Sequence, residues 1–127
     1  MTQTPKLRVA VVGASADRSK MSNKAVRAYA SLGYQVYPIN PKESQIEGLP
    51  AFRTLADLPA SADVVTLYLP PAIGLKVLAD VAKISPKEFY VNPGAESPEL
   101  MAEASKLGLD PIYACSIVAR GLNTDRF

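Results

Sequence analysis

The sequence predicts an α/β fold, a single doubly wound, Rossmann-like domain built on a five-stranded parallel sheet. Short apolar runs rich in Val, Ile and Tyr, typical of buried parallel strands, recur at 7–12, 35–39, 63–69, 88–92 and 110–115. Helical patterns separate most of these runs, and such alternation places helices on both faces of one sheet. Right-handed crossovers in a doubly wound sheet predict the spatial order 3-2-1-4-5 for the five strands.

The predicted helices carry recognisable start and stop signals. The helix expected at 19–32 is followed by Gly33, a typical residue after a helix end, and the helix expected at 71–84 begins with proline. Ser97 is the expected N-cap of a third helix. One helical turn is expected at 54–58. The residues expected to face the sheet from the first two helices are Met21, Ala25, Tyr29, Leu32, Ile73, Val77, Val81 and Ile84.

Length and composition indicate one globular domain spanning 1–127. No apolar run approaches the roughly 20 residues of a membrane span, so we expect a soluble protein. The N-terminus lacks the pattern of a secretion signal. A single cysteine excludes an internal disulfide and fits a reducing, cytoplasmic location. The net charge of +2 is too small to indicate nucleic-acid binding.

Missing residue types exclude several chemistries. The chain has no histidine, which excludes a Ser-His-Asp triad and a histidine metal site, and one cysteine cannot build a zinc site. No catalytic constellation and no metal site are predicted. The charge is uneven, however. Residues 1–53 hold eight basic and three acidic residues, net +5, whereas residues 54–127 hold six basic and nine acidic residues, net −3. This asymmetry favours a small anionic ligand near the first strands.

Ligands of open parallel sheets bind at the carboxyl ends of the strands. The sequence therefore predicts a site made from the loops that follow the five strands. These loops are Gly13-Ala14-Ser15, Asn40-Pro41-Lys42, Leu69-Pro70-Pro71, Asn92-Pro93-Gly94 and Cys115-Ser116.

The first loop has the strongest indication of phosphate binding. Gly13 permits a tight turn, and the helix that follows has free N–H groups and a dipole that favour an anion. Arg18 and Lys20 add positive charge there. The alternative is that Gly13 only connects a strand to a helix.

A dinucleotide site would follow the pattern G-x-G-x-x-G, with an acidic residue at the end of the second strand. Here Gly13 is followed by Ser15 and Arg18 at the other two glycine positions, and the second strand ends in Asn40. Both departures argue against NAD. Lys42 suits an additional phosphate near a ribose, as in NADP or coenzyme A (CoA).

The other loops each have two interpretations. Pro70 and Pro71 either only stop the third strand or form a rigid apolar edge for an adenine or pantetheine group. Asn92 to Gly94 is a turn that could also contact a ligand. Cys115 is either a small buried apolar residue or a thiol able to form a mixed disulfide with a thiol ligand.

Several segments together resemble the small stand-alone CoA-binding domain proteins, which are themselves similar to the nucleotide-binding domain of the succinyl-CoA synthetase α subunit. The segments are the run Ala-Val-Val-Gly-Ala-Ser, the basic helix start after it, the run Val-Tyr-Pro-Ile-Asn-Pro-Lys, residues 48–59, Asp63-Val-Val and Leu69-Pro-Pro. The likeness covers nearly the whole chain. The combination of the first loop with Asn-Pro-Lys is fairly specific.

The resemblance implies roles for individual residues, with CoA or an acyl-CoA as the ligand. Gly13, Ala14, Ser15 and Lys20 would hold phosphates. The adenosine end would be bordered by Asn40, Pro41 and Lys42, with Lys42 near a phosphate. The adenine or pantetheine side would be lined by Tyr68, Leu69, Pro70 and Ile73. The far end of the groove would be formed by Asn92, Pro93, Gly94 and Cys115.

The leading hypothesis is non-catalytic binding of CoA or an acyl-CoA, in a carrier, sensor or thiol-protecting role. The synthetases carry their phosphohistidine in another domain, and this chain has no histidine. One alternative is an NADP-dependent reductase. Another is a regulatory interaction domain whose nucleotide groove has decayed. The expected partner is a small nucleotide ligand rather than nucleic acid or a membrane, and exposed sheet edges permit a homodimer.

Overall fold

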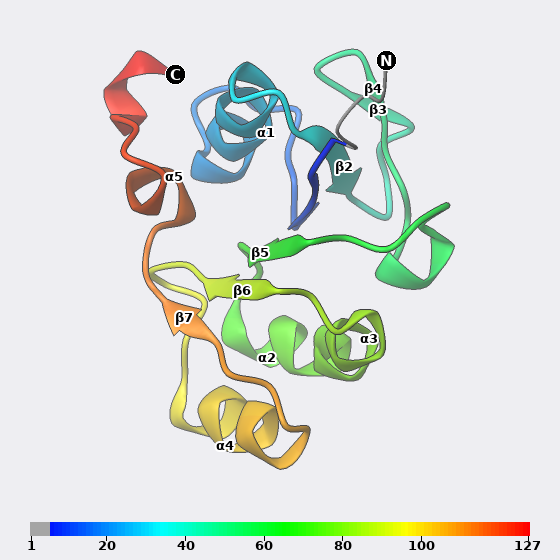
Figure 1. Cartoon of the computed structure of the whole chain (residues 1–127), viewed down its shortest axis with the longest axis vertical. Helices are drawn as coiled ribbons and strands as arrows, with labels where there is room; N and C mark the ends of the chain where they lie inside the picture. Colours follow the sequence, from blue (N-terminus) through cyan, green and yellow to red (C-terminus); the bar gives the residue numbers. More distant parts are fainter. Residues whose placement is uncertain (1–5) are drawn as a thin grey trace, which may run out of the picture.

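Two helical layers enclose a parallel sheet in the computed structural model, which describes residues 6–127 (Figure 1). The strands of the sheet are β1 (Arg8–Val12), β2 (Gln35–Ile39), β5 (Val64–Leu67), β6 (Glu88–Val91) and β7 (Ile112–Tyr113), and a separate hairpin is formed by β3 (Gln45–Ile46) and β4 (Leu49–Pro50). The α-helices are α1 (Met21–Ser31), α2 (Pro71–Gly74), α3 (Leu78–Ile84), α4 (Pro98–Lys106) and α5 (Ser116–Ala119). Short 3₁₀ helices are η1 (Leu55–Asp57), η2 (Leu75–Val77) and η3 (Thr124–Arg126). The expectation of no secretion signal rests partly on residues 1–5, outside the described range.

The fold class and the five-stranded parallel sheet are confirmed, but the strand order requires a correction. The observed order is β2-β1-β5-β6-β7, which is 2-1-3-4-5 when the five strands are counted along the chain, instead of 3-2-1-4-5. The outer edge of β2 is already occupied, because the N–H of Phe52 donates to the Pro38 carbonyl (2.9 Å) and the N–H of Asn40 donates to the Phe52 carbonyl (2.9 Å). Pro38 also lacks an N–H for a further strand. The chain therefore crosses over, and β5 pairs with the free edge of β1.

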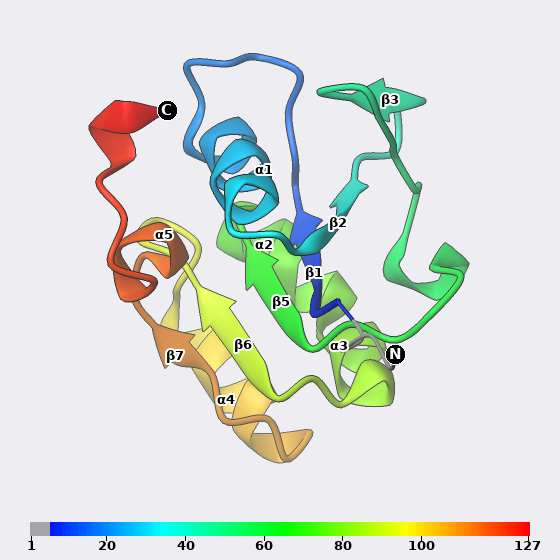
Figure 2. The ribbon, with the colours of Figure 1, turned by 45° about the horizontal axis from the view of Figure 1, so that its top comes forward.

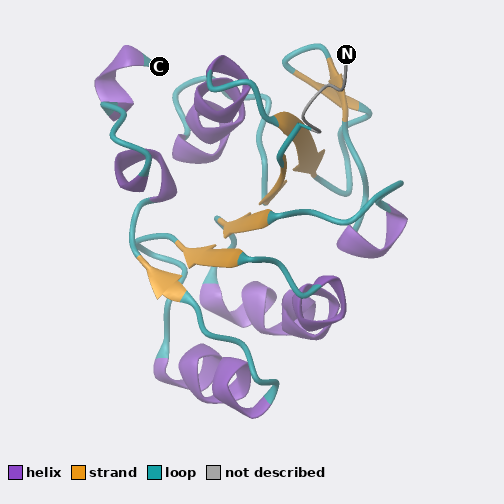
Figure 3. Ribbon diagram, viewed as in Figure 1, coloured by secondary structure: helices purple, strands orange, loops and turns teal. Residues whose placement is uncertain are grey.

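The two faces of the sheet carry different helices. Figure 2 shows α1 on one side of β1 and β5, with α2 and α3 on the other. Helix α5 shares the side of α1, and α4 lies with α2 and α3 (Figure 3). Two hydrophobic clusters fill these layers, one containing Leu67, Leu78 and Leu100, the other containing Val26 and Tyr29. Because successive residues of a strand face opposite sides, neighbours at a strand end enter different layers.

Helix α1 forms where it was expected, but a different face of it meets the sheet. Met21 and Leu32 are 39% and 42% exposed, whereas Asn23 is fully buried and Ser22 nearly so. A pattern based on apolar residues cannot recognise a buried face that contains polar groups. Ala25 and Tyr29 are buried as expected.

The segment 71–84 is a chain of short helices, α2, η2 and α3, rather than one regular helix. Val81 is fully buried as expected, whereas Ile73 is 49% exposed at the carboxyl edge of the sheet. The turn predicted at 54–58 is η1, and Ser97 caps α4 by accepting a hydrogen bond from the Leu100 N–H (3.1 Å). The last strand is shorter than predicted, only Ile112–Tyr113.

The C-terminal segment is attached to the sheet through Arg120. Its guanidinium donates to a Glu88 carboxylate oxygen at 2.6 Å and to the Tyr29 hydroxyl at 3.4 Å. It also lies within 6 Å of the ring centroids of Tyr29, Tyr34 and Tyr90. The hydrogen bond from Arg120 holds the pKa of the Glu88 carboxyl below its ordinary value. Helix α5 is thereby fixed against β6 and α1.

We expect Glu88→Gln to make stability less dependent on pH in the acid range. The folded-state pKa of Glu88 lies below its ordinary value of 4.5. The stabilisation by the carboxylate is therefore complete above that pH and is lost as the pH falls through the lowered pKa. At neutral pH, the urea unfolding midpoint of the wild-type protein should exceed that of Glu88→Gln. The difference between the two midpoints should narrow as the pH falls into the acid range.

Glu103→Gln on α4 is the matched control, because Glu103 forms no ion pair with another described residue. A gap that stays constant with pH for Glu88→Gln would contradict the role of this ion pair.

Candidate ligand-binding site

The order of the strands places the topological switch point at the carboxyl ends of β1 and β5, where ligands of such sheets bind. Gly13 follows β1 with φ +85°. A Cβ atom added there would lie 3.0 Å from Leu69 Cδ2 and 3.3 Å from the Tyr68 carbonyl carbon. The positive φ therefore favours glycine, and the close approach of the residues after β5 leaves little room for a side chain. The predicted turn at Gly13 lies at the centre of this edge.

The N–H groups of the first loop are largely engaged within the protein. Those of Gly13 and Ala14 both donate to the Ile39 carbonyl at 3.1 Å, which joins the loop to β2. The Ser15 hydroxyl accepts from the Asp17 N–H at 3.0 Å. Asp17 accepts from the N–H and the hydroxyl of Ser19, and the hydroxyl bond lowers the pKa of the Asp17 carboxyl. The turn is thus organised by its own hydrogen bonds, and its first two N–H groups are not directed at a ligand.

Asn23, a buried residue of α1, anchors the first loop through a hydrogen bond. The Asn23 amide donates to the Ser15 carbonyl (2.8 Å) and to a Glu47 carboxylate oxygen (3.2 Å). Glu47 lies in the β3–β4 hairpin and also pairs with Arg18 at 2.9 Å. Arg18 is therefore partly neutralised, whereas Lys20 is exposed at the N-cap of α1. Sequence reasoning missed Asn23 and Glu47, since neither belongs to a local motif.

Asn40 shapes the loop after β2 instead of presenting its side chain to a ligand. Its amide N–H donates to the Ala14 carbonyl at 2.8 Å, and its carbonyl oxygen accepts from the N–H groups of Lys42 (2.7 Å) and Glu43 (3.1 Å). This arrangement ties the first two loops together. It leaves Pro41 and Lys42 exposed at the edge.

Four of the predicted site residues, Gly13, Pro41, Leu69 and Ile73, line one hollow of about 290 Å³, which we call the apolar hollow. It opens between the ends of β1 and β2 and the segment from α2 to α3. The other residues that line it are Val12, Ile39, Arg53, Thr54, Leu55, Lys76, Val77 and Asp80. Its walls are formed mainly by aliphatic side chains.

Positive charge borders the apolar hollow. Pro41 and Arg53 also line a second, open hollow of about 470 Å³ that includes Lys42. We call Lys42, Arg53 and Lys76 the basic rim. None of the three forms an ion pair within residues 6–127. Arg53 and Lys76 were not predicted to belong to the site. The segment that contains Arg53 becomes part of the site only because Phe52 bridges to the edge of β2.

Tyr68 lies in the layer opposite the apolar hollow, although Leu69 beside it lines that hollow. The Tyr68 hydroxyl is 3.4 Å from the Ser116 hydroxyl, and burial raises the pKa of Tyr68 to about 12. The prediction grouped both residues on one wall. The alternation of side chains at the end of β5 separates them.

Asn92 belongs to a buried network beneath α5. It is 2% exposed, its amide N–H donates to the Thr66 hydroxyl (2.7 Å) and the Leu67 carbonyl (2.9 Å), and its oxygen accepts from the Ser116 N–H (2.9 Å). Its side chain thus connects β5, β6 and α5.

The remaining predicted residues lie around the same edge but do not line the apolar hollow. Pro70 is the exposed N-cap of α2, and Cys115 is half-buried at the start of α5. Pro93 and Gly94 are exposed, with the Gly94 N–H donating to Glu96 at 2.9 Å. Ala14 is buried within the layer of α1.

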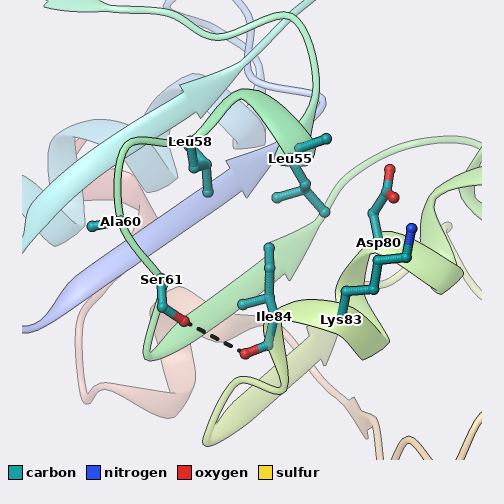
Figure 4. A pocket seen from close by; sticks show the side chains of 8 residues that line it. Leu55, Leu58, Ala60, Ser61, Asp80, Lys83 and Ile84 are labelled. Atoms are coloured by element: carbon teal, nitrogen blue, oxygen red, sulfur yellow. Dashed lines mark hydrogen bonds between the residues drawn. The ribbon is translucent and has the colours of Figure 1, made fainter.

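Another hollow, of about 400 Å³, opens on the flank between η1 and α3 (Figure 4). We call it the flank hollow. It shares Leu55 and Asp80 with the apolar hollow and extends to Ser61 and Ile84, whose hydroxyl and carbonyl are 3.5 Å apart. Ser61 precedes β5 and Ile84 precedes β6, so the flank hollow runs away from the carboxyl edge.

Two further properties concern metals and membranes. Among residues 6–127, no group of three or more His, Cys, Asp or Glu side chains is arranged to hold a metal ion. In the same part of the chain, no helix has the length and apolar character needed to cross a bilayer.

We expect Asn92→Ala to destabilise the protein by about 2 kcal/mol, because the buried Ser116 N–H would lose its partner and the Thr66 hydroxyl would keep only the Ser116 hydroxyl. Ligand affinity of the folded variant should change little, since the Asn92 amide is fully engaged internally. Denaturant unfolding and ligand titration measure the two effects separately. Pro93→Ala, at an exposed neighbour, is the control. A large loss of affinity with unchanged stability would instead indicate a ligand contact.

ADP-forming acetate–CoA ligase from Methanocaldococcus jannaschii is 28% identical over 75 residues, which are 59% of this chain and 11% of that protein. The α subunit of ADP-forming acetate–CoA ligase II from Pyrococcus furiosus is 29% identical over 63 residues, 49% of this chain and 14% of that subunit. The chain therefore spans only 11–14% of these curated relatives.

Solved structures show the same arrangement. A conserved hypothetical protein from Pyrococcus furiosus superposes with a TM-score of 0.80 at 33% identity, covering 89% of this chain and 98% of that one. The dinucleotide-forming acetyl-coenzyme A synthetase 1 of Ca. Korarchaeum cryptofilum, in complex with phosphate and ADP, superposes with a TM-score of 0.72 at 32% identity, covering 84% of this chain and 25% of that one.

A family model for a CoA binding domain matches residues 7–121. The matched range contains every strand of the sheet and all residues of the apolar hollow and the basic rim. The resemblance inferred from the sequence is thereby confirmed, and this chain belongs to the CoA-binding domain family.

Proposed function

We propose that this chain binds CoA, free or acylated, with its nucleotide part at the apolar hollow and the basic rim, and that it does so without catalysing a reaction. The observation that carries the proposal is an apolar hollow bordered by the basic rim at the switch point of the sheet. CoA combines these two chemistries, because its adenine is a flat ring system and its phosphates are anionic.

The size of the apolar hollow supports a base, not a whole cofactor, as its occupant. Pockets that enclose drug-sized ligands have volumes of roughly 300–1,000 Å³, and the apolar hollow has about 290 Å³. In this proposal Leu69 and Ile73 contact the ring. The phosphates and the pantetheine arm lie outside, along the edge of the sheet. Ile73 is then partly exposed because its side chain is available to contact the ligand.

The basic rim supports binding of the phosphates. Arg53 has a planar guanidinium that can hold a phosphate through two parallel hydrogen bonds, and Lys42 and Lys76 act as point charges. Lys20 adds charge at the start of α1, where the free N–H groups of the first turn also favour an anion. The proposal does not depend on the N–H groups of Gly13 and Ala14, which donate to Ile39.

A binding role without catalysis is consistent with the side chains that line the apolar hollow. They include one carboxyl group, that of Asp80, and one hydroxyl, that of Thr54, with no thiol among them. The ligase activity named for the relatives belongs to proteins of which this chain spans a small part. We propose a carrier, sensor or thiol-protecting role in the cytoplasm.

Thermal unfolding with CoA, acetyl-CoA, NAD, NADP and ATP tests the ligand. A ligand at about 100 times its Kd adds roughly 2.7 kcal/mol of stability, enough to raise the midpoint by several degrees. We expect a rise with CoA and acetyl-CoA only. A rise with NADP alone would favour a reductase, and no rise with any ligand would favour an interaction domain with a decayed groove. Incubation with acetyl-CoA, ADP and phosphate should release no CoA thiol above the rate without protein.

Lys42→Ala should weaken CoA roughly fivefold, and dephospho-CoA much less, if Lys42 contacts the 3′-phosphate. Isothermal titration at fixed ionic strength measures both affinities, because salt screens such a contact. Lys106→Ala, an exposed lysine at the end of α4, is the control for the loss of one positive charge. Equal losses for the two ligands would exclude a specific contact with the 3′-phosphate.

A further inference from the structure

The Asp80 carboxyl group has an unusual position in the site. It is the one carboxyl group that lines the apolar hollow, and it also lines the flank hollow. Figure 4 shows it beside Leu55, directed away from Ile84 and Ser61. Lys76 and Lys83 lie on either side of it in sequence, yet Asp80 forms no ion pair in the described part of the chain.

The apolar hollow joins two other hollows through residues of different charge. It shares Pro41 and Arg53 with the open hollow that contains Lys42. It shares Leu55 and Asp80 with the flank hollow. A ligand in the apolar hollow therefore meets a guanidinium at the first junction and a carboxylate at the second, with Lys76 also in the lining. The two junctions favour one orientation of a ligand with an anionic end and a hydrogen-bond donor at its opposite end.

The nucleotide part of CoA, adenosine with a 3′-phosphate and a 5′-diphosphate, has this polarity. Its phosphates are anionic, and its base carries a 6-amino group, a hydrogen-bond donor, at the far edge of the ring. We propose that Asp80 is a specificity-determining residue that accepts a hydrogen bond from the 6-amino group of adenine, with the ribose phosphate directed toward Arg53 and Lys42. This inference rests on the proposed function and adds the orientation of the ligand and the selection of the base.

The physical basis of the selection is the difference between an amino and a keto group. A carboxylate accepts a hydrogen bond from the amino group, and hydrogen bonds to charged groups are stronger than neutral ones. Hypoxanthine has a keto oxygen at the same position, which places one acceptor against another. A site with a fixed polar group rejects a ligand that cannot satisfy it. The same aliphatic walls would otherwise bind either ring.

Isothermal titration with CoA and with its inosine analogue, in which hypoxanthine replaces adenine, tests the proposal. The wild-type protein should bind CoA roughly tenfold more tightly. In Asp80→Ala the two affinities should become nearly equal, mainly through a loss for CoA. In Asp80→Asn they should also converge, because an amide can accept from the amino group or donate to the keto group. Lys83→Ala is the matched control, since Lys83 lines only the flank hollow, and it should keep the wild-type ratio.

The outcomes separate this inference from the proposed function. Equal wild-type affinities for the two ligands, or a variant at Asp80 that keeps the preference for CoA, would overturn the inference while CoA binding stands. Absence of binding by the wild-type protein would overturn both. Thermal unfolding without ligand establishes whether each variant is folded. If Asp80→Ala is unfolded, the nearly isosteric Asp80→Asn provides the test.

Discussion

The turn at Gly13 is the constraint on which the carboxyl edge of the sheet depends. Its left-handed backbone lets the chain leave β1 while Leu69, just after β5, approaches so closely that a side chain at position 13 would press against it. Because Ile39 accepts hydrogen bonds from the N–H groups of Gly13 and Ala14, the same turn is also attached to β2. One residue therefore sets the relative positions of three strand ends. The apolar hollow forms between them.

Polar side chains near this edge serve mainly to hold loops in place. Asn23, Asn40 and Asn92 each use both ends of the amide for hydrogen bonds within the protein. A buried amide without partners would cost free energy, and a loop whose carbonyl groups lack donors would not be well ordered. The groups left to line the apolar hollow are consequently aliphatic side chains and exposed cations, together with Thr54 and Asp80. This division explains why no asparagine lines the apolar hollow.

Much of the fold and part of the site could be predicted because the relevant signals are local. The glycine turn, the prolines at helix starts and the Ser97 cap each act over a few residues. Gly13, Pro41, Leu69 and Ile73 meet in one hollow because strand ends meet at one edge. Tyr68 and Asn92 were predicted for the same groove, yet they face the other layer. Their positions depend on the registers of β5 and β6 and on the docking of α5, which no local pattern encodes.

The alternation of strands and helices, the position of the first turn and the family resemblance could all be predicted, because these depend on residues close together in the chain. The strand order depends instead on tertiary contacts. Phe52 occupies the outer edge of β2, which leaves β5 to pair with β1, and this contact spans residues far apart in sequence. The same bridging brings Arg53 to the hollow, and the packing of α3 brings Asp80. Burial and edge pairing are properties of the whole domain, so the composition of the site could be read only from the folded chain.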